Sequence, residues 1–485
     1  MKMFQTIRYR LKRVSSVQLA FWGSLLLSLV AIGGVATIGK DGALYVDIAK
    51  TVVEQGVAGG FQRFNWPWFS ILLAWTHQVT ALPLETAAYL LCALFTAGTC
   101  ALLVDCVRSR YPDAAYWAVL VVLAMPAFNA FRSDIIREHG FWFFSVLALW
   151  LALHWRVRGG WALAAASQIA IAVAALFRLE ALMLCAALTL WLAPELRSRA
   201  GWLRMLQFNA LPLLLLLLAA ITLVGRGGFS QGRVEYYLQL LDVRQISDAF
   251  ALITEQFADS LKYKYSKDEA GQIVFFGLLA AILIKFIKLL GPFALPLLSR
   301  QGRSALFSCW RAFNLFVLVW VFYMLVLMVF FIQQQFINSR YVSFLNLLVV
   351  PLFAFTLFSF VSKYPRLAKG VVVVALLVMT DNVVSLGAKK NHYIAAGQWL
   401  ASHGERNDVV YYDDPRIGYY AGWGYPHVSE TREMAMGEGA ERYRYFFIEA
   451  DKEEAWLQAW LSQQQRRVLG EFVNRKGDSV LVIGE

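Results

Sequence analysis

Charged side chains are scarce in this sequence, because Asp, Glu, Lys and Arg make up only 16% of its 485 residues. Hydrophobic residues make up 59%, aromatic residues 15%, and the mean hydropathy is +0.53. No soluble domain sustains such a composition over this length. The composition therefore excludes a wholly soluble protein and predicts a polytopic membrane protein.

Cysteine is also sparse, and the five residues all lie within or beside apolar runs. They are Cys92, Cys100, Cys106, Cys185 and Cys309. Their spacing matches no metal-ligand motif. We interpret them as small hydrophobic side chains inside the membrane, which excludes a disulfide framework and a cysteine-bound zinc site.

Two further features argue against binding of nucleotides or nucleic acids. The sequence contains no glycine-rich P-loop for nucleotide phosphates. The net charge is +12, but the basic residues occur in short clusters between apolar runs. Such clusters indicate membrane topology signals rather than a surface for nucleic acid.

Eleven apolar runs predict transmembrane helices. A helix needs roughly 20 residues to cross a bilayer, and several of the runs are shorter than this. The runs are 17–38, 84–106, 114–131, 141–155, 161–177, 180–193, 206–224, 272–293, 312–332, 341–360 and 367–384. The basic segment 1–13 precedes the first run, which has no small-residue cleavage site and is therefore expected to be a retained helix. Every second connection is basic, from Arg108 and Arg110 to Lys363, Arg366 and Lys369. This pattern favours eleven spans with the C-terminus outside.

The outer connections contain the expected soluble elements. The transmembrane domain, 1–387, has long outer loops at 39–83 and 225–271. We predict in the first loop a helix at 43–55, a glycine-rich break at 56–60 and a surface helix at 68–79, and in the second an amphipathic interfacial helix at 246–261. The alternatives are a re-entrant or additional span for 68–79 and a helix packed on other helices for 246–261. Residues 388–485 are predicted to form a small outer α/β domain, with strands at 408–412, 445–448, 467–473 and 479–483 and helices at 394–402 and 452–463.

Polar residues gather at the outward ends of the predicted spans. Asp134 and Glu138 are four residues apart, with Arg137 between them, and are expected to share a helix face. With His139 they form either a weak candidate metal cluster or a structural group of ion pairs. Arg178 and Glu180 must face protein or a watery cavity, either as functional groups or as a self-satisfying pair.

The planar guanidinium group of arginine is suited to binding phosphate oxygens, so Arg178 and Arg340 are candidates for binding an anionic lipid head group. The alternative for Arg340, which opens a late span with Tyr341, is a snorkelling interfacial arginine. Asp41 is either the N-cap of the helix that follows or a catalytic base. Asp47, six residues on, is expected to be solvated.

The arrangement resembles the glycosyltransferase C superfamily, in particular the bacterial relatives of protein O-mannosyltransferases and the lipid A aminoarabinose transferases. The resemblance covers the whole chain in architecture and rests on four short motifs. They are Asp41-Gly-Ala-Leu-Tyr45 with Ile48-Ala49, Trp66-Pro-Trp-Phe69, Phe177-Arg-Leu-Glu180 and Ser339-Arg-Tyr341. Family members commonly have an Asp-Glu pair where this chain has Asp41-Gly42, which leaves the use of a divalent metal and the type of acceptor open.

The resemblance implies an inverting glycosyltransferase of the bacterial inner membrane that moves a hexose or pentose from a polyprenyl-phosphate donor to a lipid, glycan or protein acceptor. Asp41 would be the catalytic base, and Arg178, Arg340 and Tyr341 would bind the donor phosphate. Tyr45, Asp134, Arg137, Glu138 and Glu180 would line the substrate cavity at the outer leaflet, facing the periplasm or exterior.

Two other functions stay open at the level of sequence. A transporter or flippase of lipid-linked saccharides would have paired, broken spans and ionisable residues near mid-membrane. This chain has its ionisable residues at the outer ends of the runs and no internal repeat, which favours the enzyme. A polysaccharide polymerase or ligase would use an oligosaccharide pyrophosphate instead.

Overall fold

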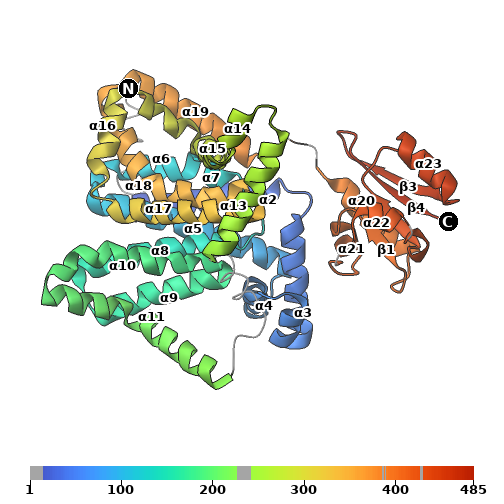
Figure 1. Ribbon diagram of the computed structural model, residues 1–485, viewed down its shortest axis with the longest axis horizontal. Helices are drawn as coiled ribbons and strands as arrows, with labels where there is room; N and C mark the ends of the chain where they lie inside the picture. Colours follow the sequence, from blue (N-terminus) through green and yellow to red (C-terminus); the bar gives the residue numbers. More distant parts are fainter. Residues whose placement is uncertain (1–14, 227–241, 385–386, 388, 427–429, 438) are drawn as a thin grey trace. The chain divides into compact units, whose positions relative to one another are not determined.

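The structure is a computed structural model that describes residues 15–226, 242–384, 387, 389–426, 430–437 and 439–485 (Figure 1). The basic N-terminal segment and the first part of the outer loop 225–271 lie outside these residues. The chain divides into two compact units. The helical unit comprises Met1–Val30, Leu91–Arg132 and Arg137–Val383, and the mixed unit comprises Ala31–Leu90, Ser133–Ile136 and Val384–Glu485.

All eleven apolar runs lie on helical segments. The helices that belong to the helical unit, or enter it, are α2 (Ser16–Gly33), α5 (Leu84–Arg110), α6 (Ala115–Ala124), α7 (Pro126–Asn129), α8 (Glu138–Arg158), α9 (Trp161–Phe177), α10 (Met183–Leu192), α11 (Arg199–Arg226), α13 (Val243–Ser260), α14 (Lys264–Asp268), α15 (Ala270–Leu290), α16 (Arg300–Cys309), α17 (Asn314–Gln334), α18 (Ser339–Lys363) and α19 (Pro365–Val383). The expected amphipathic helix of the second outer loop is α13.

The chain is a multi-pass membrane protein. In its described part, seven helical stretches are long and apolar enough to cross a membrane. They are Ser16–Gly33, Leu84–Arg110, Glu138–Arg158, Leu179–Arg197, Ala270–Leu298, Asn314–Gln334 and Ser339–Lys363. Pro112–Ala124 and Trp161–Phe177 are shorter apolar helices. The count of eleven crossings stays a prediction.

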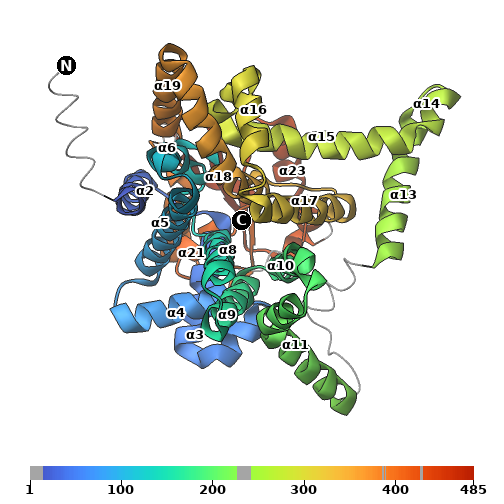
Figure 2. The same cartoon turned by 90° about the vertical axis from the view of Figure 1, so that its left-hand side faces the viewer.

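Helix α18 packs against α6, α15, α16 and α17 (Figure 2). Most of its residues are apolar, and most of them are buried. A helix of this kind is buried rather than amphipathic. The N-terminal end of α18 carries Arg340 and Tyr341, and its packing therefore determines where those two side chains lie.

A close approach between α8 and the end of α9 determines the position of Arg178. Gly140 lies on α8, and a Cβ atom there would be only 2.2 Å from Cε1 of Phe177. Phe177 also stacks on Phe144, with ring centroids 5.8 Å apart. Because α9 ends at Phe177, the chain leaves the helix at Arg178 with its side chain next to α8.

We expect Gly140→Ala to lower the stability of the helical unit by about 1–3 kcal/mol, because the new methyl group overlaps a ring that has little room to move. The control is Gly277→Ala on α15, where nothing lies within 4 Å of the added Cβ. That change should be neutral or stabilising by up to about 1 kcal/mol. Thermal unfolding of the detergent-solubilised protein distinguishes them, and equal melting temperatures would contradict the close approach.

The mixed unit contains the first outer loop and the C-terminal domain. The loop forms α3 (Lys40–Arg63) and α4 (Trp68–Thr80). The helix predicted at 68–79 is thus confirmed as a helix. The predicted glycine-rich break is only partly right, because the chain leaves helical geometry at Gly56 alone, with φ of +76°, and the helix resumes through Arg63.

The C-terminal domain has the predicted α/β architecture. Its elements are α20 (Asn391–His403), β1 (Val410–Tyr412), α21 (Arg416–Tyr420), α22 (Arg432–Met436), β2 (Tyr445–Ile448), α23 (Ala455–Gln463), β3 (Arg467–Val473) and β4 (Ser479–Gly484). The sheet order is β1-β2-β4-β3, with β1 and β2 parallel and the other pairs antiparallel.

Helices cover both faces of this sheet. Along β2, Phe446 packs with Leu457 and Leu461 of α23. Its neighbour Phe447 belongs to a second cluster that includes Leu400 of α20. Successive side chains of a strand point to opposite faces, so one apolar strand serves both cores.

Candidate functional site

Asp41 lies in the first turn of α3. The helix begins at Lys40, and its N-cap is Gly39, which makes no side-chain capping bond. The sequence-based alternative of Asp41 as the N-cap is therefore wrong. A carboxylate in the first turn still interacts favourably with the positive end of the helix dipole.

The charge of Asp41 also acts on Tyr425. Burial and the negative charges of Asp414 and Asp41 raise the pKa of Tyr425 to about 12.

The start of α3 is held by the C-terminal domain. The backbone N–H of Ile38 donates to the hydroxyl oxygen of Tyr420 at 2.8 Å. Lys40 pairs with Asp414 at 3.2 Å. Arg416 donates to the carbonyl oxygen of Ile38 at 3.3 Å. Three contacts thus fix the residues on either side of Gly39, immediately before Asp41.

Asp414 is the centre of this attachment. It is fully buried and accepts from Nε and Nη2 of Arg416 at 2.9 and 2.7 Å. Burial opposes its ionisation, but the hydrogen bonds and charge of Arg416, together with Lys40, outweigh burial and hold the pKa of Asp414 below its usual value. The Arg416 guanidinium in turn lies 4.2 Å above the ring of Tyr393.

We expect the mixed unit to lose stability at acid pH through Asp414. Because the folded pKa is depressed, the stabilisation is complete above the unfolded pKa of about 3.9 and is lost as the pH falls through the folded value. Asp414→Asn should lower the melting temperature at pH 7 and flatten its decline below about pH 4. Glu441→Gln, an exposed change in the same domain, is the control. An unchanged pH profile in Asp414→Asn would contradict this role.

Asp47 lies further along α3 and is buried, so the expectation that it is solvated is wrong. Its Oδ2 accepts from Nη2 of Arg63 at 2.7 Å, and the same nitrogen donates to the carbonyl oxygen of Tyr425 at 3.2 Å. The ring of Tyr45 is buried edge-on against Phe69, with centroids 5.2 Å apart.

In the helical unit, Arg178 lies between two carboxylates. Its Nη1 donates to Oε1 of Glu138 at 2.7 Å, and its Nη2 donates to Oε1 of Glu180 at 2.5 Å. Only 5% of Arg178 is exposed. Arg178 and Glu180 therefore face protein, which is one of the two surroundings expected for them.

Arg340 and Tyr341 complete this cluster. Nε of Arg340 lies 3.4 Å from the Glu138 oxygen that Arg178 also contacts. The guanidinium carbon of Arg178 lies 4.2 Å from the centroid of the Tyr341 ring, and that of Arg340 lies 5.3 Å from it. The hydroxyl of Tyr323 donates to the carbonyl oxygen of Tyr341 at 3.1 Å. Sequence reasoning missed Tyr323, because it lies inside an apolar run with no charged neighbour.

The cluster contains more than one arginine around each carboxylate. The charge of Arg137 also acts on Glu138 and Glu180, in addition to that of Arg178. Arg340 is the more accessible of the two paired arginines, with 22% of its side chain exposed. The arrangement can bind an anion through Arg340 while the carboxylates hold Arg178 in place.

Asp134 is not on a helix face with Glu138, because α8 begins only at Glu138 and residues 134–136 are irregular. His139 contacts the hydroxyl of Thr96 at 3.0 Å and the carbonyl oxygen of Phe131 at 3.0 Å. The candidate metal cluster of these three residues is therefore wrong. Among the described residues, no group of three or more His, Cys, Asp or Glu side chains is arranged to hold a metal ion.

The candidate residues fall in two units. Asp41, Tyr45 and Asp134 belong to the mixed unit. The helical unit contains Arg137, Glu138, Arg178, Glu180, Arg340 and Tyr341. The single outer cavity expected from the sequence stays a prediction. Sequence reasoning missed the contacts of Asp414, Arg416 and Tyr420 with the start of α3, because these residues are far from it in the sequence.

The fold is shared with a solved transferase structure, in line with the fold expected from the resemblance to the glycosyltransferase C superfamily. The chain is similar in structure to an oligosaccharyltransferase from Archaeoglobus fulgidus in complex with Zn and sulfate, with a TM-score of 0.51 and 11% identity over 96% of this chain and 73% of that chain. Two structures of ArnT from Cupriavidus metallidurans, without ligand and with undecaprenyl phosphate, also align over 96% of this chain and 97% of theirs. Their TM-scores are 0.45 and 0.44, each at 14% identity. The sequence matches no protein-family model and no curated protein.

Proposed function

We propose that this protein is an inverting glycosyltransferase that moves a sugar from a polyprenyl-phosphate donor to an acceptor at the outer face of the membrane. The observation that carries the proposal is the arginine and carboxylate cluster around Arg178, which lies at the ends of apolar helices and includes the partly exposed side chain of Arg340. The archaeal protein of similar fold transfers oligosaccharides, which supports the class of reaction by analogy.

The donor phosphate is assigned to Arg340 and Tyr341. Arg340 has an accessible guanidinium fork that fits phosphate oxygens. Arg178 is engaged by Glu138 and Glu180, so its part is to hold Tyr341 and balance the carboxylates. Positive charge at this place stabilises the negative charge that develops on the leaving phosphate.

Asp41 is assigned as the base. Its carboxylate takes the proton of the acceptor hydroxyl as the hydroxyl oxygen attacks the anomeric carbon of the sugar. The bond from that carbon to the phosphate oxygen breaks, and its electron pair leaves with the polyprenyl phosphate. The new bond forms on the opposite face, which inverts the configuration. The three contacts before Asp41 keep the first turn of α3 in place during this step.

The remaining assignments follow the sequence-based expectations. The proposed location is the bacterial inner membrane, with the C-terminal domain facing the periplasm or exterior. Tyr45, Asp134, Arg137, Glu138 and Glu180 are the proposed lining of the substrate cavity. The acceptor is a lipid, glycan or protein, and the use of a divalent metal is left open.

The test compares envelope glycolipids and glycoproteins by mass spectrometry in cells with and without the gene. A mass increment of one sugar that is lost with the gene identifies both the sugar and its acceptor. The purified protein in lipid nanodiscs should then release polyprenyl phosphate from the matching donor. Movement of the intact donor across vesicles without release of phosphate would contradict the proposal and favour a flippase.

A further inference from the structure

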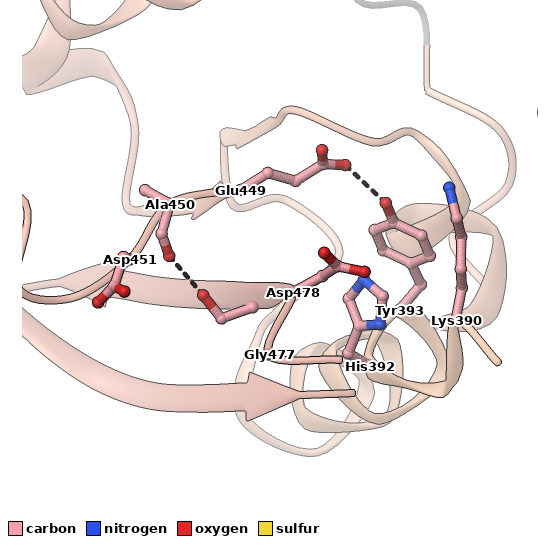
Figure 3. Close-up of a pocket in the computed structure, with 9 residues that line it drawn as sticks. Lys390, His392, Tyr393, Glu449, Ala450, Asp451, Gly477 and Asp478 are labelled. Carbon is pink, nitrogen blue, oxygen red and sulfur yellow. Dashed lines mark hydrogen bonds between the residues drawn. The ribbon is translucent and has the colours of Figure 1, made fainter. Parts of the chain in front are cut away.

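A cavity of about 370 Å³ opens on the C-terminal domain (Figure 3). It is formed by the segment that begins α20, the residues that follow β2 and the turn between β3 and β4. Its lining residues are Lys390, His392, Tyr393, Glu449, Ala450, Asp451, Gly477, Asp478 and Ser479. All nine belong to the mixed unit, and none has been assigned above to sugar transfer.

The cavity carries an excess of negative charge. Three of its side chains, Glu449, Asp451 and Asp478, are carboxylates, whereas Lys390 is the one basic side chain that lines it. Over the described residues, none of the three carboxylates forms an ion pair. The cavity therefore disfavours anions and attracts cations.

The carboxylates keep free acceptor capacity. Oε1 of Glu449 accepts one bond from the Tyr393 hydroxyl at 2.8 Å, which Figure 3 shows as a dashed line. Oδ2 of Asp478 accepts one bond from the side chain of Asn474 at 2.7 Å. A carboxylate offers about four lone pairs, so each can accept further bonds from a ligand.

His392 provides an independent sign of a ligand. Only 3% of the residue is exposed, and its Nδ1 is buried without a hydrogen-bond partner in the described part of the chain. Buried polar atoms in proteins almost always have a partner. Burial lowers the pKa of His392, although the charges of Asp478 and Glu449 oppose this, so the ring is neutral near pH 7. In Figure 3 the ring lies beside the carboxylate of Asp478.

We propose that this cavity binds the ammonium group of a small organic amine, with Glu449 and Asp478 as anionic acceptors and Nδ1 of His392 as a further hydrogen-bond partner. An ammonium group carries three donors, which suits several acceptors around one cavity. A metal ion fits less well, because no group of three ligands in the described residues is arranged for one. The proposal holds whether or not the chain transfers sugar.

The test is isothermal titration calorimetry on the full-length protein in nanodiscs. Putrescine represents a free amine and Nα-acetyl-lysinamide represents a lysine side chain, and 1,4-butanediol is the uncharged match of putrescine. We expect saturable binding of at least one amine and none of the diol, and the tighter of the two amines identifies the source of the ammonium group. Equal binding of the diol, binding of Ca²⁺ in place of the amines, or binding of neither amine would overturn the proposal.

Variants locate the binding. Glu449→Gln and Asp478→Asn should each lower the affinity for the amine about tenfold or more, because each removes an anionic acceptor and keeps the shape of the side chain. His392→Phe should lower the affinity for the amine to a smaller extent. The control is Glu441→Gln, which changes an exposed carboxylate outside the cavity. Thermal unfolding checks that each variant is folded, and unchanged affinity in both carboxamide variants would overturn the proposal.

Discussion

Asp41→Asn is expected to slow sugar transfer by about 10²–10⁴-fold, the range over which a positioned general base contributes. The asparagine keeps the size of the side chain but cannot take a proton from the acceptor. The loss should therefore appear in kcat, and binding of polyprenyl phosphate should change little. Release of polyprenyl phosphate from the donor in the presence of acceptor measures the rate.

The matched control for Asp41 is Glu54→Gln on the same helix. Glu54 is exposed and lies 3.9 Å from Lys50, so its removal should leave the rate unchanged. The interaction of the Asp41 carboxylate with the helix dipole is worth only about 0.3–1 kcal/mol, so both variants should melt at nearly the same temperature. Transfer by Asp41→Asn at the wild-type rate would remove Asp41 from the role of base.

Arg178→Gln is expected to destabilise the helical unit by about 3–5 kcal/mol. The change leaves two carboxylates, Glu138 and Glu180, in a buried place without the guanidinium that both contact. Removing one partner of a buried ion pair has an effect of this size because the groups left behind lose their shortest charged hydrogen bonds. The melting temperature of the detergent-solubilised protein measures the loss.

Arg340→Gln should behave in the opposite way. Its side chain is partly exposed and lies 3.4 Å from Glu138, so the melting temperature should change little. The affinity for polyprenyl phosphate should fall by about 1.5–3 kcal/mol, or roughly 10–100-fold, because a charged hydrogen-bond donor to phosphate is lost. Microscale thermophoresis with polyprenyl phosphate checks this.

The pair of arginine variants separates structure from binding. Glu180→Gln in the background of Arg178→Gln should restore part of the lost stability, since it removes a buried carboxylate that has lost its contact with Arg178. A large loss of stability in Arg340→Gln, or normal stability in Arg178→Gln, would reverse the two assignments. Equal affinity for polyprenyl phosphate in Arg340→Gln and wild type would remove the phosphate site from Arg340.

The local elements of the protein could be predicted from the sequence. Apolar runs indicated most helices of the membrane part, although α14 and α16 lie outside every run. The alternation of strand-like and helical segments after residue 388 indicated the C-terminal domain. These signals depend on hydrophobic periodicity over a few turns or residues, which any one segment carries by itself. The candidate residues Arg178, Glu180 and Arg340 were also visible, because charges at the ends of apolar runs are rare.

The partners of those residues were decided only by the tertiary structure. Glu138 and Arg178 are 40 positions apart, and Ile38 and Arg416 are 378 apart, so no local pattern links them. The expected helix face shared by Asp134 and Glu138 does not exist, because the chain becomes helical only at Glu138. A buried charge needs a compensating group but accepts it from any element that packs nearby. The sequence by itself therefore determined which residues need partners, and the packing of distant segments decided which partners they have.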